Sequence, residues 1–84
     1  MKIRLDVVYR KQTSRWYVVR DRVPSNGAGH DSFVQAWGIA RLGALALMED
    51  GHAVSVYRHR RDGRLRKDGE RTFPRSADPR RSPG

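Results

Sequence analysis

The chain has 84 residues and no cysteine, and its 18 Lys and Arg against nine Asp and Glu give a net charge of +9. This length indicates one domain with a thin core, and the lack of cysteine excludes disulfides and thiolate metal sites. The three histidines lack zinc-ligand spacing, so we expect no metal and no cofactor. No apolar stretch approaches the roughly 20 residues that cross a bilayer, and the N-terminus does not resemble a signal peptide. We therefore expect a soluble cytoplasmic protein that does not bind membranes.

Two strands joined as a hairpin are predicted at the start of the chain. Every second residue from Ile3 to Tyr9 is apolar, and the residues between are charged except Val8, which is the period-two pattern of a strand with one buried face. A polar turn at residues 11–14 leads into residues 15–20, which are rich in β-branched and aromatic side chains. Residues 24–30 are predicted to form a loop, in which Asn26-Gly27 is the favoured turn.

A helix is predicted over residues 32–50. Ser32 and Gln35 have the spacing of a capping box, and Gly51 follows as a C-terminal stop. The stripe of apolar side chains that is expected to cover the sheet consists of Phe33, Ala36, Trp37, Ala40, Ala44, Leu47 and Met48. We expect Trp37 to be buried between the helix and the sheet.

A third strand is predicted at residues 53–59, with Val54 and Val56 buried. Asp62-Gly63 and Asp68-Gly69 are both tight-turn signals, and they permit one short hairpin with residues 64–67 between them. From residue 74 the chain is rich in proline and arginine. Residues 1–73 are therefore predicted to form a single domain, and residues 74–84 an extended or disordered basic tail.

These elements together predict an α+β fold with the order β-β-α-β. The sheet is expected to be antiparallel, with three strands, or four if the basic hairpin joins it. One helix packs on one face of this sheet. A basic C-terminal hairpin and a flexible tail complete the predicted chain.

Several short segments match a known family. They are Val7-Val8, Trp16-Tyr17-Val18-Val19, an alanine-rich helix, the RDGRLR run at residues 61–66, Thr72-Phe73-Pro74, Asp78-Pro79 and Pro83-Gly84. With these segments, which span most of its length, the chain resembles a small bacterial and phage family known as domain of unknown function 2188. It departs from that family in its helix, where Ile39, Leu42 and Leu45 replace the usual polar residues. The resemblance implies the β-β-α-β fold and no activity, because the family has no established one.

Positive charge is concentrated behind the third strand. Residues 58–84 contain ten Arg and Lys and four Asp and Glu, and therefore carry +6 of the net +9. Like charges at close quarters destabilise a compact domain, and nucleic acid is the commonest polyanion that explains such a pattern. Arginine suits phosphate because its guanidinium is planar and permanently charged. The residues predicted to bind phosphate here are Arg58, Arg60, Arg61, Arg64, Arg66 and Lys67.

A simpler reading of this arginine-rich segment is a solvated hairpin that protects a sheet edge from pairing. Asp62, Asp68 and Glu70 could then pair with nearby arginines and weaken the positive field. The sequence leaves both readings open.

The sheet face that the helix leaves open is a second candidate surface. The side chains expected to point toward the helix are Ile3, Leu5, Val7, Trp16, Val18, Val54 and Val56. The side chains expected on the opposite face are Lys2, Arg4, Arg10, Arg15, Tyr17, Ser55, Tyr57 and His59. The predicted nucleic-acid-binding residues among them are Arg4, Arg15, Tyr17 and Tyr57, since cations beside exposed rings suit phosphates and stacked bases. The alternative is an ordinary polar sheet face with stabilising cross-strand aromatic pairs.

The helix is also apolar on a second side. The residues predicted to form a dimer or partner interface there are Val34, Gly38, Ile39, Leu42 and Leu45. A sheet covers only one side of a helix, and a helical glycine costs about 1 kcal/mol relative to alanine although it lets another backbone come close. We therefore predict a homodimer. The alternative is that residues 21–30 or the C-terminal tail cover this side.

No catalytic site is predicted, and the chain is not expected to be an enzyme. His30, Asp31 and Ser32 are adjacent, but adjacency in sequence is not the geometry of a catalytic triad. The sequence favours a basic binding domain that contacts the phosphates of DNA or RNA with little sequence specificity, since no helix carries polar base-reading side chains. The alternative is a protein-interaction module, such as a phage or accessory factor that docks on a larger host protein through its hydrophobic helix.

Overall fold

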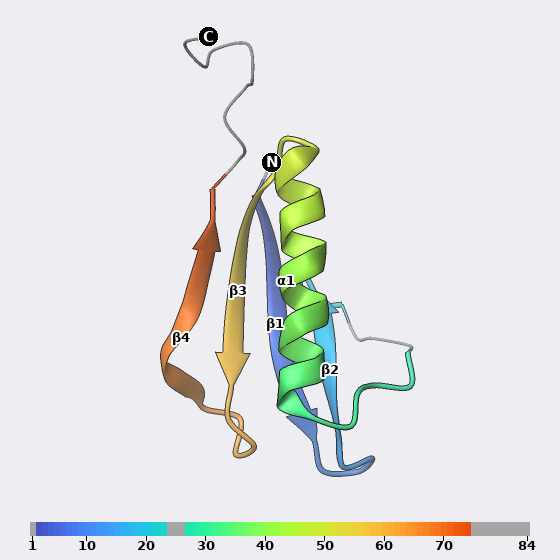
Figure 1. Ribbon diagram of the computed structural model, residues 1–84. Coiled ribbons are helices and arrows are strands. Elements are labelled where there is room, and N and C mark those ends of the chain that lie inside the picture. The colour runs from blue at the N-terminus through green and yellow to red at the C-terminus, as the bar shows by residue number, and fades with distance from the viewer. Residues whose placement is uncertain (1, 24–26, 75–84) are drawn as a thin grey trace, which may run out of the picture.

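The computed structural model of the chain describes residues 2–23 and 27–74. Within these residues the elements follow the order β1 (Lys2–Arg10), β2 (Arg15–Arg20), α1 (Phe33–Glu49), β3 (Ala53–His59) and β4 (Leu65–Phe73). The helix lies across one face of a four-stranded sheet (Figure 1). The predicted α+β class is confirmed, as are the first two strands, the helix and the third strand. The tail predicted from residue 74 lies, from residue 75 onward, outside the described residues.

The strands form one mixed sheet in the order β2-β1-β3-β4. Both hairpins, β1/β2 and β3/β4, are antiparallel, whereas β1 and β3 are parallel neighbours in which Ile3 pairs with Val54. The prediction of a purely antiparallel sheet is therefore wrong at the centre of the sheet. The helix returns the chain to the end from which β1 starts, so β3 runs in the direction of β1, and a helical crossover is the usual route to such a pairing.

Part of the outer edge of β2 is covered by the segment that leads into α1. His30 forms an isolated antiparallel bridge with Trp16, in which each backbone N–H donates to the carbonyl of the other residue at 2.7–2.9 Å. The segment that leads into α1 thus occupies part of the free edge of β2. β3 joins the sheet on the other side of the hairpin, beside β1.

Only the first of the two Asp-Gly pairs forms the predicted turn. Asp62-Gly63 connects β3 to β4, where Gly63 has a φ of +90° and donates its N–H to Arg60 O at 2.9 Å. Asp68-Gly69 lies inside β4, where Asp68 has a φ of +57° and the pairing with β3 changes register. The turn predicted at Asp68-Gly69 is therefore wrong. A bulge there takes extra residues into the strand, and the basic segment becomes a fourth strand.

The core lies between α1 and the sheet. Ala36, Ala40 and Ala44 are buried, and their small side chains let the helix lie close to the strands. The large side chains that are fully buried on the sheet are Ile3, Val7, Val54 and Val56. The partly buried residues packed around this core include Phe33, Trp37, Leu47 and Met48. Both the predicted helix stripe and the predicted inward face of the strands are confirmed.

Side chains and a glycine define the ends of α1. Ser32 Oγ accepts a hydrogen bond from Gln35 N at 3.1 Å, which caps the first turn. Gln35 Oε1 accepts from Asp31 N at 3.1 Å, one residue earlier than in a standard capping box. After the helix, Gly51 has a φ of +94°, which a glycine adopts without strain. No helix in the described part of the chain combines the length and apolarity needed to cross a membrane.

Candidate nucleic-acid interface

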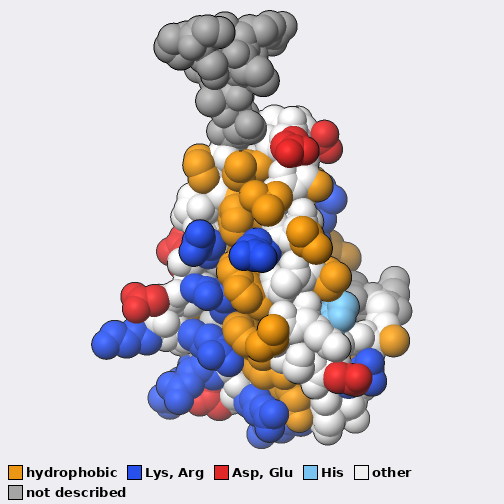
Figure 2. Space-filling model, in the orientation of Figure 1, with side chains coloured by type: hydrophobic (Ala, Val, Ile, Leu, Met, Phe, Trp, Pro, Cys, Tyr) orange, Lys and Arg blue, Asp and Glu red, His pale blue; other side chains and the backbone are white. Residues whose placement is uncertain are grey.

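The β1/β2 turn, the β3/β4 turn and the start of α1 lie at the same end of the sheet (Figure 1). β1 and β3 are parallel, so both run toward this end, and the helix begins there. Lys and Arg side chains gather over this end and beside β4 in Figure 2. We term this surface the basic end, and it consists of Arg58, Arg60, Arg61, Arg64, Arg66 and Lys67.

A depression of about 680 Å³ lies between the β3/β4 hairpin and the start of α1. Its walls are formed by Arg60, Arg61, Arg66 and Lys67 from the hairpin and by Trp16, Asp31, Ser32 and Phe33 from the other side. The only acid among these lining residues is Asp31, which already forms an ion pair with Arg15 at 3.0 Å. The depression is therefore lined by four cations and by no acid that lacks an ion-pair partner.

The acids of the hairpin form no ion pair with the cations of the basic end among the described residues. The ion pairs found among residues 2–23 and 27–74 join Arg4 and His59 to Asp6, Arg15 to Asp31, and Arg20 to Asp21. Asp62 instead accepts a hydrogen bond from the backbone N–H of Arg64 at 2.9 Å. The local pairing that would have weakened the positive field is thus not found in the described part of the chain.

Aromatic rings orient two of the arginines. The Cζ atom of Arg66 lies 3.8 Å from the ring centroid of Phe33, and that of Arg61 lies 5.1 Å from the centroid of Tyr9. Both rings pack against Trp16, at centroid distances of 5.1 Å and 5.2 Å. A guanidinium held over a ring keeps N–H groups at its edge that can still bind an anion.

Three cations of the basic end have free side chains. Arg60, Arg64 and Lys67 are exposed, and within the described residues their side chains form no hydrogen bond or ion pair. Charges of this kind contact a polyanion without first breaking an internal interaction.

The side chain of Arg58 binds within the fold, and Arg66 also donates from Nε to His59 O at 3.4 Å. Arg58 donates to Asp68 O at 2.6 Å and to Gly69 O at 3.2 Å, and its Cζ lies 4.6 Å from the ring centroid of Trp37. These contacts tie the bulge of β4 to α1. Trp37 is therefore half-buried beneath Arg58 at the edge of the helix, and the prediction that it is buried between helix and sheet is only partly correct.

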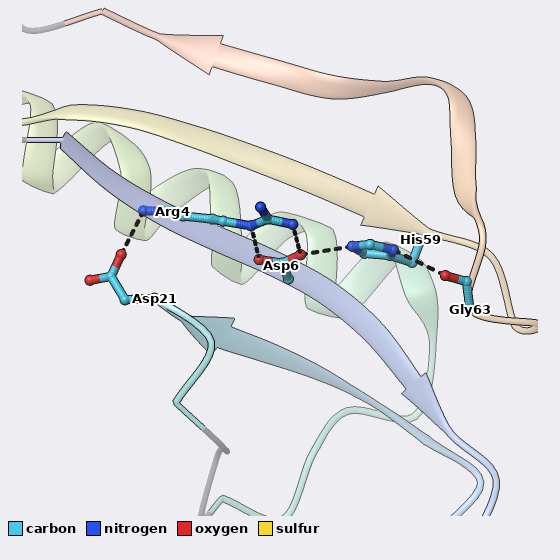
Figure 3. Close-up of polar contacts among 5 residues, drawn as sticks. All are labelled: Arg4, Asp6, Asp21, His59 and Gly63. Carbon is cyan, nitrogen blue, oxygen red and sulfur yellow. Dashed lines mark hydrogen bonds and ion pairs between the residues drawn. The ribbon is translucent and has the colours of Figure 1, made fainter.

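The open sheet face carries the predicted side chains, but they bind one another. Arg4 donates to Asp6 from Nε at 2.8 Å and from Nη2 at 3.0 Å (Figure 3). Its Cζ also lies 4.2 Å from the ring centroid of Tyr57. The guanidinium of Arg4 and one face of Tyr57 are thus already occupied.

Arg15 and Tyr17 are also engaged within the protein. Arg15 pairs with Asp31 and donates to Gly29 O at 3.3 Å, so it is linked to the rim of the depression. Tyr17 is only 5% exposed and donates its hydroxyl to Thr13 Oγ1 at 2.8 Å. Gly29 lies so close to the Tyr17 ring that a Cβ on Gly29 would be 2.8 Å from Cε2 and Cζ of Tyr17. The exposed ring expected at Tyr17 is therefore not found.

A buried acid on the open face was not among the predicted site residues. Asp6 is 7% exposed, and besides Arg4 it contacts His59 Nε2 at 2.8 Å, while His59 Nδ1 lies 3.4 Å from Gly63 O in the β3/β4 turn (Figure 3). Burial would raise the pKa of Asp6, but the hydrogen bonds from Arg4 and His59 outweigh it and hold that pKa below its ordinary value. The cluster ties the hairpin of the basic end to the sheet. Its only sequence signal is an acid within an apolar strand.

The residues predicted at an interface lie together on the outer side of α1. Val34, Ile39, Leu42 and Leu45 are 40–74% exposed, and a hollow of about 500 Å³ surrounds Gly38. This surface is separate from the depression at the basic end, and the two share no lining residue.

The chain matches no protein-family model, no curated protein and no solved structure. Its resemblance to domain of unknown function 2188 therefore stays a prediction from the sequence. Within residues 2–23 and 27–74, no group of three or more His, Asp or Glu is placed to hold a metal ion.

Proposed function

We propose that the protein binds nucleic acid in the cytoplasm through backbone phosphates at the basic end, with little sequence specificity and without catalysis. The depression lined by four cations is the main support for this proposal, because its one acid is already paired with Arg15. Arginine binds phosphate through two parallel N–H···O contacts, and lysine binds it as a point charge. Exposed cations around the depression then extend the contact along a phosphate backbone.

Two features favour phosphate contacts over base recognition. The outer side of α1 is apolar and its inner side packs on the sheet, so the helix offers no row of polar side chains to a groove. Tyr9 and Phe33 each have an arginine over the ring, which leaves less aromatic surface for stacked bases. Contacts to phosphate position a protein on nucleic acid but carry no sequence information directly.

Binding of a duplex DNA and of a single-stranded RNA, each of arbitrary sequence, at about 50 mM salt tests the proposal. We expect both to be retained, with affinities that change little when the sequence is permuted. If neither the DNA nor the RNA is retained at this salt concentration, the proposal is overturned.

A second candidate function is a protein-interaction module that docks on a larger host protein through α1. The exposed apolar side chains of Val34, Ile39, Leu42 and Leu45 favour it, because isolated domains rarely leave such a group in water. Capture of partners from native lysate with and without nuclease separates the two functions. A partner that is lost with nuclease supports nucleic-acid binding, and one that survives nuclease and is lost in a Leu42→Lys variant supports docking.

A further inference from the structure

One helical turn of α1 presents a hollow and a protruding side chain next to each other. No atom lies within 4 Å of the point where a Cβ on Gly38 would be. The hollow there is lined by the apolar residues Val34, Ile39 and Leu42 and, at its rim, by the polar residues His30, Gln35 and Arg41. Leu42 follows Gly38 by four residues, so both lie on the same side of the helix, and Leu42 is 62% exposed. The surface therefore contains both halves of a knob-into-hole contact.

Such a surface is complementary to itself. If two copies of α1 pack antiparallel about a two-fold axis between Gly38 and Leu42, the Leu42 side chain of each copy enters the hollow over Gly38 of the other. A two-fold axis always pairs one patch with the same patch on the partner, which is the commonest symmetry of soluble oligomers. The contact also covers Val34 and Ile39, which flank the hollow.

Charge selects the antiparallel arrangement. A parallel pair would bring the two basic ends together, whereas an antiparallel pair places them at opposite ends of a helix of 17 residues, about 25 Å long. That separation exceeds the screening length of about 8 Å at physiological salt. Glu49 and Asp50, at the C-terminal end of α1, then lie toward the basic end of the other copy.

We propose that the protein is a homodimer in which the outer side of α1 packs antiparallel against the same surface of a second copy. The interface consists of Val34, Gly38, Ile39, Leu42 and Leu45. This arrangement leaves both basic ends free, so it does not depend on the proposed nucleic-acid binding.

Light scattering on the full-length chain at tens of micromolar tests the proposal. We expect a mass of twice 9.7 kDa for the unmodified protein. Gly38→Gln fills the hollow and should give a folded monomer with an unchanged circular dichroism spectrum, because the space around Gly38 is empty and glutamine favours a helix more than glycine does. Loss of the dimer in this variant is therefore not a result of unfolding.

Gly43→Gln is the matched control. A Cβ on Gly43 would also have no atom within 4 Å. Gly43 follows Gly38 by five residues, so it points about 140° away from Gly38 around the helix axis. We expect this variant to remain a dimer. A mass of 9.7 kDa for the unmodified chain overturns the proposal and leaves the helix surface to a different partner. A dimer that persists in Gly38→Gln, or one that is lost equally in Gly43→Gln, overturns the arrangement about Gly38.

Discussion

The imidazole of His59 lies 2.8 Å from the buried carboxylate of Asp6, a residue 53 positions earlier in the chain. The second ring nitrogen of His59, Nδ1, lies 3.4 Å from Gly63 O in the β3/β4 turn. His59 therefore links Gly63, in the turn that carries the arginines, to Asp6 on β1. The hairpin of the basic end is therefore held by a cluster of charged side chains on the sheet face that α1 does not cover.

Asp6→Asn should lower the free energy of unfolding by about 1–3 kcal/mol at neutral pH, because it leaves Arg4 and His59 without their carboxylate. The pKa of Asp6 is lower in the folded protein than in the unfolded chain. Its contribution to stability is thus fully present above about pH 4, and it is lost as the pH falls through the folded pKa. Urea unfolding of both proteins from neutral to acidic pH measures the difference.

The stabilities of the unmodified protein and of Asp6→Asn should converge as the pH falls below 4. Asp68→Asn makes the same change at an exposed acid whose side chain forms no ion pair or hydrogen bond among the described residues, and asparagine tolerates the positive φ there. This variant should track the unmodified protein at every pH. A constant gap between the unmodified protein and Asp6→Asn across the acid range would show that the charge of Asp6 does not stabilise the fold.

Local patterns in the sequence were sufficient to predict the strands and the helix and the face that each of them buries. Alternation over residues 2–10, broken only at Val8, places Ile3 and Val7 toward the helix, because a strand exposes successive side chains on opposite faces. The helix stripe through Ala36, Ala40 and Ala44 follows in the same way from the helical period. Such periodicities depend only on neighbouring residues, and so a single sequence reveals them.

Pairings between distant segments could not be predicted. Nothing in the sequence near β3 indicates that it pairs with β1, or that the outer edge of β2 is bridged by His30. The contact between Asp6 and His59 depends on that parallel pairing, because it joins β1 to β3. At the basic end, the sequence identified the arginines, but the rings beneath Arg61 and Arg66 belong to β1 and α1, which the fold alone brings there.

Gly69→Ala should destabilise the protein by about 1–3 kcal/mol through steric crowding. A Cβ at this position would lie 2.6 Å from Arg58 O and 2.7 Å from Arg66 O, and both are backbone atoms that cannot rotate away. Gly43→Ala, in open space on the helix, should instead stabilise by about 0.5–1 kcal/mol. Thermal unfolding of the two variants gives the comparison, and a tolerated alanine at Gly69 would contradict the bulge in β4.

The two tryptophans should differ in their access to solvent. Trp16 is 4% exposed beneath Tyr9 and Phe33, whereas Trp37 is half-buried under Arg58. Acrylamide should therefore quench the fluorescence of a Trp16→Phe variant, which retains Trp37, more strongly than that of a Trp37→Phe variant. Equal quenching would contradict the position of Trp37 at the helix edge.

The dependence of nucleic-acid affinity on salt tests the role of the basic end most directly. Each duplex phosphate neutralised contributes about 0.9 to the slope of log K against log salt, so three to five contacts predict a slope of roughly −3 to −5. The test variant replaces three exposed arginines of the basic end by glutamine, namely Arg60, Arg61 and Arg64. The control removes the same charge from the opposite end of the sheet, by glutamine at Lys2, Arg20 and Arg22.

We expect the triple variant at the basic end to flatten the slope by about 2–3 and to keep its thermal stability, since the three side chains are exposed. The control variant should keep a slope close to that of the unmodified protein. If the variant of Arg60, Arg61 and Arg64 binds with an unchanged slope, or if the control flattens the slope equally, the phosphates are not bound at the basic end.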